Sequence, residues 1–332
     1  MTKLIGKISG CGSSVPKLVV TNDDLKKVVD TNHEWISTRT GISERRIATT
    51  ESAEDLAFKA AKDALDASSL SPSDIDLIVV GTVTPDMAFP STACLVQTRL
   101  GVPSGVPAFD VSAACSGFLY ALDIADKYIK SGSVKHALVI GVDLFSRLLD
   151  WSDRSTCVLF GDGAGAVVLS SSKGSSGLLS SYIHSDGRHW EMLYAPMGEA
   201  GKVPFVKEAH KHRAHPKHCV KMNGNEVFKL AVRTMGKAIQ EALDGAGLKP
   251  EDVSLLIPHQ ANIRIISAMQ DRLKLPDEKV FSNIDKYGNT SAGSIPLALA
   301  EAVTSGRVKK GDIVLFVAFG GGLTWASAAV RW

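Results

Sequence analysis

Cys115 is the residue whose surroundings most directly suggest covalent chemistry. It lies in Phe109 to Phe118, FDVSAACSGF, after an apolar run that predicts a strand and before Ser116 and Gly117, which predict a helix start. The positive end of a helix dipole favours a thiolate, so this placement predicts a lowered pKa and an activated sulfur. Small neighbours would let a thioester come close to the backbone. The alternative is a buried structural cysteine, as most lone cysteines are.

Two further side chains could act with such a thiol. His259, in LLIPHQAN, follows a predicted buried strand, and the active-site groups of α/β sheets gather at strand ends. Asn289 lies in KYGNTSAGS, a loop that precedes a predicted helix and is expected to occupy the position in the second repeat that the Cys115 loop occupies in the first. The glycines of Ala318 to Trp325, AFGGGLTW, could donate N–H groups to an oxyanion. Together these residues predict one convergent site.

Two other segments carry side chains that could bind ligands. Residues 31–46 place Trp35 among arginines, which suits an adenine ring and phosphates but also fits an exposed loop with a packed tryptophan. The segment His210 to Cys219 contains four histidines and one cysteine, in spacings that match no standard zinc framework. We interpret it as a solvated basic loop and expect no functional metal.

The overall composition excludes several classes of function. A chain of 332 residues with 45% hydrophobic residues and a net charge of +2 is too balanced for a nucleic-acid-binding protein. Its five scattered cysteines, without CxxC spacing, favour a reducing compartment, and no secretory signal is evident. The longest apolar run, Ile313 to Leu323, is too short to span a bilayer. We expect a cytoplasmic protein that binds neither nucleic acid nor membrane.

An internal repeat indicates the fold class. Ala64 to Val80 aligns without gaps to Ala242 to Pro258, and each copy reads as a helix end, a turn with proline and a buried strand. FGDGAGAVVL likewise corresponds to FGGGLTWASAAV; FGDGAG lacks the GK[ST] ending of a phosphate loop and is interpreted as packed strand backbone. Alternating helices and strands predict an α/β protein with parallel-rich sheets, in two halves at residues 1–172 and 173–332.

These motifs together resemble those of β-ketoacyl-acyl-carrier-protein synthase III, the thiolase-superfamily condensing enzymes that initiate type II fatty acid synthesis. The resemblance extends from the first predicted strand to Trp332 and rests on NHEWISTRTGI, FDVSAACSGF, FGDGAGAVVL, MNGNEVFK, HQANIRII, YGNTSAGS and FGGGLTW. It implies a thiolase-like duplicated αβαβα layered fold. It also implies an acyltransferase that condenses an acyl-CoA, first of all acetyl-CoA, with malonyl-acyl carrier protein. Coenzyme A would enter as part of a substrate, so no cofactor is implied.

The resemblance also implies roles for single residues. The implied catalytic triad is Cys115, His259 and Asn289. The implied oxyanion hole consists of the N–H groups of Cys115 and Gly321. The implied coenzyme A contacts are Trp35, Arg39, Arg154 and Asn225. The implied docking site for acyl carrier protein is Arg264, Lys229 and Arg272. Phe89 would cross the interface of a homodimer to line the partner's acyl pocket.

The sequence departs from the family pattern at two places. Ser155 follows Arg154 where glycine is usual, which puts the adenine contacts in question. The segment His210 to Cys219 is longer than usual, which leaves its effect on the pocket entrance open. The starter acyl chain is also open, because pocket depth depends on packing.

Three other functions compete with this interpretation. A chalcone-synthase-like or quinolone-forming condensing enzyme of secondary metabolism would share the triad, although a basic patch at Arg264 and the pair Trp35 and Arg154 favour the fatty acid enzyme. A cysteine hydrolase would need a base able to activate water. A carrier-binding scaffold without activity would not take an acyl group from acetyl-CoA.

Overall fold

The computed structural model describes residues 4–196 and 218–332. The elements of the first half, with 3-10 turns labelled η, are β1 (Ile5–Ser14), β2 (Leu18–Thr21), α1 (Asn22–Leu25), α2 (His33–Thr40), β3 (Glu44–Ile47), α3 (Ala53–Ser68), η1 (Pro72–Asp74), β4 (Leu77–Gly81), α4 (Thr92–Leu100), β5 (Ala108–Val111), η2 (Ala114–Ser116), α5 (Gly117–Lys130), β6 (His136–Leu144), η3 (Phe145–Leu148), α6 (Arg154–Cys157) and β7 (Asp162–Ser172). Those of the second half are β8 (Gly177–Ser185), η4 (Gly187–Met192), β9 (Leu193–Tyr194), β10 (Lys221–Met222), α7 (Gly224–Ala246), η5 (Pro250–Asp252), β11 (Leu255–Pro258), α8 (Ile263–Leu273), η6 (Asp277–Lys279), α9 (Ile284–Tyr287), η7 (Ser291–Gly293), α10 (Ser294–Thr304), β12 (Ile313–Gly320) and β13 (Thr324–Arg331).

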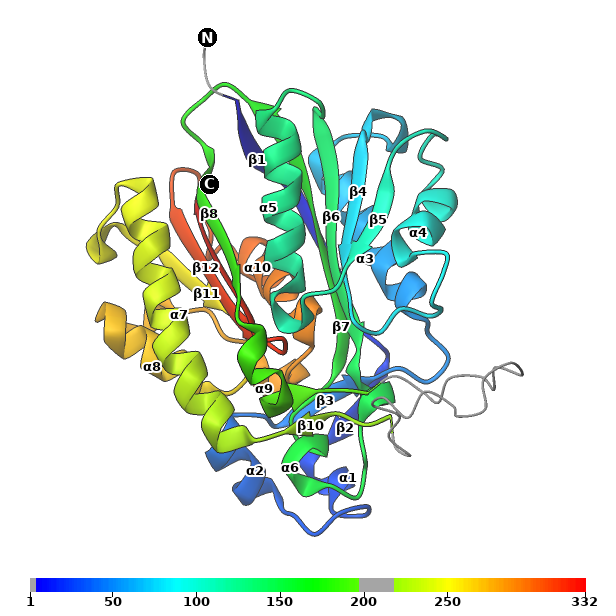
Figure 1. Cartoon of the computed structure of the whole chain (residues 1–332), viewed down its shortest axis with the longest axis vertical. Helices are drawn as coiled ribbons and strands as arrows, with labels where there is room; N and C mark the ends of the chain where they lie inside the picture. Colours follow the sequence, from blue (N-terminus) through cyan, green and yellow to red (C-terminus); the bar gives the residue numbers. More distant parts are fainter. Residues whose placement is uncertain (1–3, 197–217) are drawn as a thin grey trace.

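Two sheets stack with helices between them and outside them (Figure 1). The five-stranded sheet has the order β1-β7-β6-β4-β5, and the four-stranded sheet has the order β11-β12-β13-β8. Figure 1 shows α7 and α8 on the left, α5 and α10 between the sheets, and α3 and α4 on the right. A central apolar cluster joins both sheets to α5 and α10, and separate clusters lie under α3 with α4 and under α7 with α8. Helices and sheets therefore alternate in the αβαβα order that the sequence predicted.

The internal repeat corresponds to a repeated supersecondary unit. In the first half α3 leads through the η1 turn into β4, and in the second α7 leads through the η5 turn into β11. β4 pairs parallel with β6, as β11 does with β12, and β7 and β13 add antiparallel strands to these pairs. The correspondence stops at β5, whose place in the second half is taken by a single bridge between Leu256 and Val280.

Helix starts occur where the sequence signals placed them. Ser52 caps α3, with its side chain accepting from the Asp55 N–H and the Asp55 carboxylate accepting from the Ser52 N–H. Ser91 caps α4 and Thr21 caps α1 in the same way. These side chains satisfy the first N–H groups of their helices, which otherwise lack partners.

The FGDGAG motif is strand backbone, as predicted. Its residues lead into β7, and a Cβ at Gly165 would lie 2.4 Å from the backbone nitrogen of Leu297 in α10. Glycine is therefore required where this helix of the second half crosses the sheet of the first. β7 ends at Ser172 and β8 begins at Gly177, so the predicted division at residues 172 and 173 falls in the connection between the two sheets.

Most of the histidine-rich segment lies outside the described residues, and only His218 and Cys219 belong to them. Within residues 4–196 and 218–332, no helix is long and apolar enough to cross a membrane.

Candidate active site

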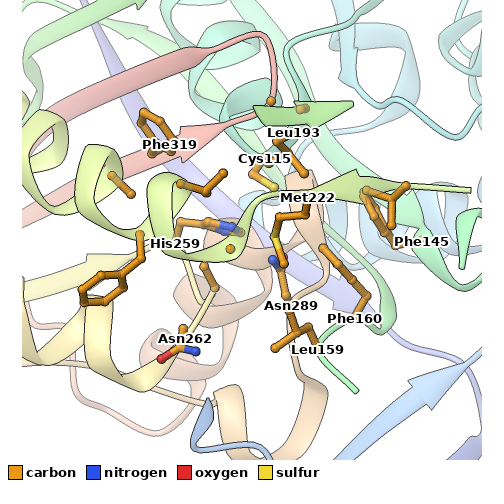
Figure 2. Close-up of a pocket in the computed structure, with 18 of the residues that line it drawn as sticks. Cys115, Phe145, Leu159, Phe160, Leu193, Met222, His259, Asn262, Asn289 and Phe319 are labelled. Atoms are coloured by element: carbon orange, nitrogen blue, oxygen red, sulfur yellow. The ribbon is translucent and has the colours of Figure 1, made fainter. Parts of the chain in front are cut away.

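One cavity of about 820 Å³ brings together the three side chains that the sequence singled out. Cys115, His259 and Asn289 all line it, although they come from the start of α5, the end of β11 and the loop before α10. Figure 2 shows the three around one space, with Phe145 and Phe160 on one side and Phe319 on the other. The stacking of the two halves therefore creates the convergence that the sequence predicted.

Cys115 is held in a tight turn between β5 and α5. Ala114 has φ of 46°, in the left-handed region that is unusual for a residue with a Cβ, and Cys115 follows it in the η2 turn. A Cβ at Gly320 would lie 2.7 Å from the Cys115 nitrogen, so the end of β12 packs directly against the backbone of Cys115. The Cys115 side chain is only 7% exposed.

The expectation of a lowered thiol pKa is wrong for the protein without substrate. Burial raises the pKa of the Cys115 thiol to about 12, and the Asp143 carboxylate adds to this increase. Desolvation penalises the thiolate more than the helix dipole stabilises it. The resting group is therefore a neutral thiol, and any reaction as a thiolate would first require loss of the thiol proton.

His259 is neutral for the same reason. It is 2% exposed, and burial lowers the pKa of its imidazole to about 3. Its backbone N–H donates to the Val317 carbonyl at 2.8 Å, which fixes the end of β11 against β12. Neither ring nitrogen has a hydrogen-bond partner among the described residues. The imidazole is thus available to donate one N–H to a ligand in the cavity.

Asn289 presents its amide nitrogen to the cavity. Its Oδ1 accepts a hydrogen bond from the Ser291 N–H at 2.9 Å, so the oxygen is turned toward the backbone of its own loop. Its N–H donates to the Leu159 carbonyl at 2.9 Å, and its carbonyl accepts from the Gly161 N–H at 3.0 Å. These bonds hold the loop to the segment before β7 and leave the Nδ2 group as a donor.

Thr324 connects the glycine turn after β12 to the loop that carries Cys115. Its hydroxyl can donate to the Ala113 carbonyl at 2.8 Å or to the Gly321 carbonyl at 3.2 Å. Gly321 and Cys115 both line the cavity. The Ser116 hydroxyl also donates to the Thr324 carbonyl at 3.2 Å. This arrangement keeps the backbone of residue 321 beside that of Cys115, where paired N–H donors would serve an oxyanion.

Three of the four residues expected to bind coenzyme A lie against one another: Trp35, Arg39 and Arg154. Trp35 and Arg39 line the cavity with Asn225, and the Arg39 and Arg154 guanidinium carbons lie 4.7 Å and 4.8 Å from the centre of the Trp35 ring. The Arg154 guanidinium also donates to the Asp30 carbonyl at 2.9 Å. Arg154 itself lies outside the cavity lining, whereas its neighbour Ser155 belongs to it.

The three basic residues expected to bind a carrier protein do not form one patch. Arg264 lines the cavity and lies 4.9 Å from the centre of the Phe228 ring, next in sequence to the exposed Lys229. Arg272 lies in a separate surface hollow, and a Cβ at Gly236 would lie 2.6 Å from its Nε. Arg264 thus packs on α7 at Phe228, the Lys229 amine donates to the Glu226 carboxylate at 2.8 Å, and Arg272 lies against another part of α7.

Phe89 lies far outside any core. It is 86% exposed, in the loop between β4 and α4. The same loop is anchored through Asp86, which accepts from the N–H groups of Ala53 and Glu54 at 3.0 Å and 2.9 Å. A large apolar side chain on an anchored loop is typical of an interaction site.

Sequence reasoning missed the aromatic walls of the cavity. Phe145 and Phe160 stack with ring centres 4.1 Å apart, and Trp190 and Tyr194 meet edge to face at 5.3 Å. Phe319 closes the opposite side. No single periodic pattern marks these residues, because they come from 3-10 turns, a loop and two strands that only folding brings together.

Stacked sheets that enclose a pair of helices, with a cysteine at the N-terminus of one helix, form the thiolase-like fold, and the chain is a condensing enzyme of that superfamily. A family model described as 3-oxoacyl-[acyl-carrier-protein (ACP)] synthase III matches residues 109–187, and the model of its C-terminal part matches residues 243–332. In the described part of the chain, no group of three or more His, Cys, Asp or Glu side chains could hold a metal ion.

Full-length relatives make the assignment specific. The β-ketoacyl-[acyl-carrier-protein] synthase III of Aquifex aeolicus (strain VF5) is 53% identical over 98% of this chain and 99% of the relative. The crystal structure of 3-oxoacyl-[acyl-carrier-protein] synthase III from Aquifex aeolicus VF5 matches with a TM-score of 0.91 and 53% identity, over 98% of this chain and 100% of that one. The priming β-ketosynthase of the R1128 polyketide pathway matches with a TM-score of 0.90 at 35% identity, over 99% and 96% of the two chains. The chain belongs to the β-ketoacyl-[acyl-carrier-protein] synthase III family, acyltransferases that catalyse the condensation initiating fatty acid synthesis.

Proposed function

We propose that the chain joins an acyl-CoA to malonyl-acyl carrier protein through an acyl group carried on Cys115. In the first step the sulfur attacks the thioester carbonyl, the carbon–sulfur bond to CoA breaks, and the thiol proton leaves with the CoA sulfur. The backbone N–H groups of Cys115 and Gly321 would receive the oxyanion of the tetrahedral intermediate. The buried, apolar lining of the cavity would keep water from the acyl-enzyme.

The second step requires donors for an enolate. When malonyl-acyl carrier protein loses CO₂, negative charge moves to the oxygen of its thioester. We assign its stabilisation to the His259 imidazole and the Asn289 amide. Support comes from the neutral state of His259 and from the Ser291 N–H that turns Oδ1 of Asn289 away. The resulting carbanion attacks the acyl-enzyme, and the released Cys115 sulfur regains a proton. Neutral donors suffice for this charge, so we propose that the reaction uses no metal or redox cofactor.

We assign the nucleotide of the acyl-CoA to Trp35, Arg39, Arg154 and Asn225. The Arg154 guanidinium already lies against the Trp35 ring, so an adenine that stacks on that face must displace it. Its bond to the Asp30 carbonyl is exposed, and such contacts are weak enough to exchange. The pantetheine arm would then extend past Asn225 toward Cys115.

We assign carrier protein docking to Arg264 and Lys229, at the mouth of the same cavity. Acyl carrier proteins are acidic, and the net charge of this chain is only +2, so attraction requires a local group of cations. Arg272 would contribute less, because its guanidinium packs beside Gly236.

We also propose that the chain acts as a homodimer in the cytoplasm. β5 is an edge strand, and Phe89 protrudes from the loop before α4, so a second copy could cover both. Sedimentation velocity on the wild type and on Phe89→Asp tests this assembly: we expect a dimer that the substitution weakens, and an active wild-type monomer at assay concentration would contradict it. The five cysteines are free thiols, which fits a reducing compartment.

The buried thiol beside two neutral donors is the observation that carries this function. The decisive experiment supplies a panel of acyl-CoA starters and then malonyl-acyl carrier protein, with mass spectrometry of the Cys115 peptide and of the carrier product. We expect an acyl adduct with the starter alone and a 3-ketoacyl carrier product after the second addition. Turnover of the thioester without malonyl substrate would instead indicate a hydrolase.

A further inference from the structure

A buried hydrogen bond joins the loop that carries His259 to the loop that carries Asn289. The backbone N–H of Gln260, the residue after His259, donates to the Ser294 hydroxyl at 2.8 Å. Ser294 begins α10, directly after the η7 turn whose first N–H holds the Asn289 side chain. Gln260 and Ser294 are each 1% exposed and lie behind the cavity lining rather than in it. They are therefore placed to act on the two donors without touching a substrate.

The Gln260 side chain anchors the backbone that donates this hydrogen bond. Its Nε2 donates to the Pro258 carbonyl at 2.7 Å and to the Phe281 carbonyl at 3.3 Å. Its Oε1 accepts from the Ser282 hydroxyl at 2.9 Å and from the Asn283 N–H at 3.2 Å. Every donor and acceptor site of the carboxamide is thus in use. The peptide of residue 260 is anchored to the strand end behind it, and its N–H points in one direction, toward Ser294.

The imidazole of His259 has no comparable anchor of its own. Its two nitrogens lack hydrogen-bond partners within the described residues, so the position of the ring follows from its backbone and from packing. On the other side, Asn289 is oriented by the Ser291 N–H, two residues along the same turn that Ser294 extends. The bond from Gln260 to Ser294 connects the backbone beside His259 directly to the helix start that follows the Asn289 turn.

We propose that Ser294 is a positioning residue for decarboxylation, because its hydroxyl sets the spacing between His259 and Asn289. The inference rests on the roles proposed above for these two residues. Donors must lie within about 2.7–3.1 Å of the developing oxyanion, and a displacement of about 1 Å costs a large part of the rate. Acylation depends on a different connection, in which Thr324 links the Cys115 loop to the glycine turn.

The test compares the two half-reactions in the full-length Ser294→Ala variant. Acylation is measured as the mass increase of Cys115 with acetyl-CoA, and decarboxylation as CO₂ release from malonyl-acyl carrier protein. We expect the kcat of decarboxylation to fall about tenfold with an unchanged KM, while acylation stays within about twofold of the wild type. Ser294→Thr keeps the hydroxyl and should recover most of the lost rate.

Ser180→Ala is the matched control. Ser180 is also buried, and its hydroxyl donates to the Ala242 carbonyl at 2.6 Å in a part of the fold away from the cavity. It should cost comparable stability without separating the half-reactions. Unchanged decarboxylation in Ser294→Ala, an equal loss in both half-reactions, or no recovery in a folded Ser294→Thr would overturn the inference. If His259→Ala and Asn289→Ala decarboxylate as fast as the wild type, the proposed function fails instead.

Discussion

The loop that presents Cys115 and the loop that presents Asn289 follow the same backbone course in the two halves. Ala114 and Ser291 have positive φ angles of 46° and 51°, and each begins a 3-10 turn that leads into α5 or α10. By this alignment the equivalent of Cys115 is Ala292. The two loops therefore occupy corresponding positions, as predicted, although Asn289 itself lies earlier in the second loop, before Ser291.

The difference shows that a duplicated backbone can carry two separate kinds of chemistry. The turn in the first half places a thiol at the start of a helix, while the same turn in the second half has only a methyl group there. The second half instead contributes an amide from the approach to its turn and an imidazole from the end of β11. Under the proposed function, the first half makes the covalent bond and the second half handles the charge of the enolate.

The largest expected effect comes from removing the thiol of the first loop. Cys115→Ala should abolish acylation by acetyl-CoA and lower condensation by about 10⁴-fold or more, because no other side chain can form the thioester. Mass spectrometry after incubation with acetyl-CoA measures the adduct. Cys157→Ala is the control, since Cys157 is fully buried and lies outside the cavity lining. An adduct on Cys94 or Cys157 would show that another sulfur is the nucleophile.

Removing a donor from the second half should affect only the later step. His259→Ala and Asn289→Ala should each lower decarboxylation about 10²–10³-fold, because one hydrogen bond to the enolate is lost. Both variants should still take up an acyl group on Cys115. Single-turnover assays of the two half-reactions separate these effects. If acylation fell as far as decarboxylation, the division of chemistry between the two loops would be incorrect.

Substitutions at the proposed binding sites for the two substrates, Trp35 in the first half and Arg264 in the second, should have smaller effects. Arg264→Glu should slow the use of malonyl-acyl carrier protein about tenfold at low salt, and less at high salt, because rim charges mainly raise the association rate. Trp35→Ala should weaken acylation by acetyl-CoA instead, because stacking on the indole is lost. Initial rates for each half-reaction at two ionic strengths make the comparison.

Arg272→Glu is a control for this contrast. Its position in a separate hollow beside Gly236 predicts a weaker effect on carrier protein use than that of Arg264→Glu. Equal losses in both half-reactions for Arg264→Glu would place that residue in the shared tunnel rather than on a docking surface.

The smallest expected effect concerns stability and pH. Burial lowers the pKa of His259 from 6.5 to about 3, so between these values the unfolded chain binds a proton that the folded chain does not. The free energy of unfolding should therefore decrease as pH falls from 6.5 toward 3, by up to about 1.4 kcal/mol per pH unit from this residue. His259→Gln should flatten this dependence, which urea denaturation at a series of pH values measures. Parallel pH profiles would show that the imidazole is charged in the folded state.

Local signals in the sequence were sufficient for most of the architecture. Capping residues such as Ser52 and Ser91 mark helix starts in the sequence, and the gap-free repeat around Pro72 and Pro250 predicted the duplicated unit. These features depend on short-range hydrogen bonds and on hydrophobic periodicity, which a linear sequence records directly.

The sequence by itself determined which side chains are available for chemistry, because a thiol, an imidazole or a carboxamide is a property of one residue. Only the tertiary structure decided their charge states. The field of α5 alone predicted a thiolate at Cys115, but burial between the two halves overrode that local effect and raised the pKa to about 12. The link from Gln260 to Ser294 and the stacked rings of Phe145 and Phe160 have the same origin. Each joins segments that are not neighbours in the chain, and desolvation and spacing arise only when such segments pack together.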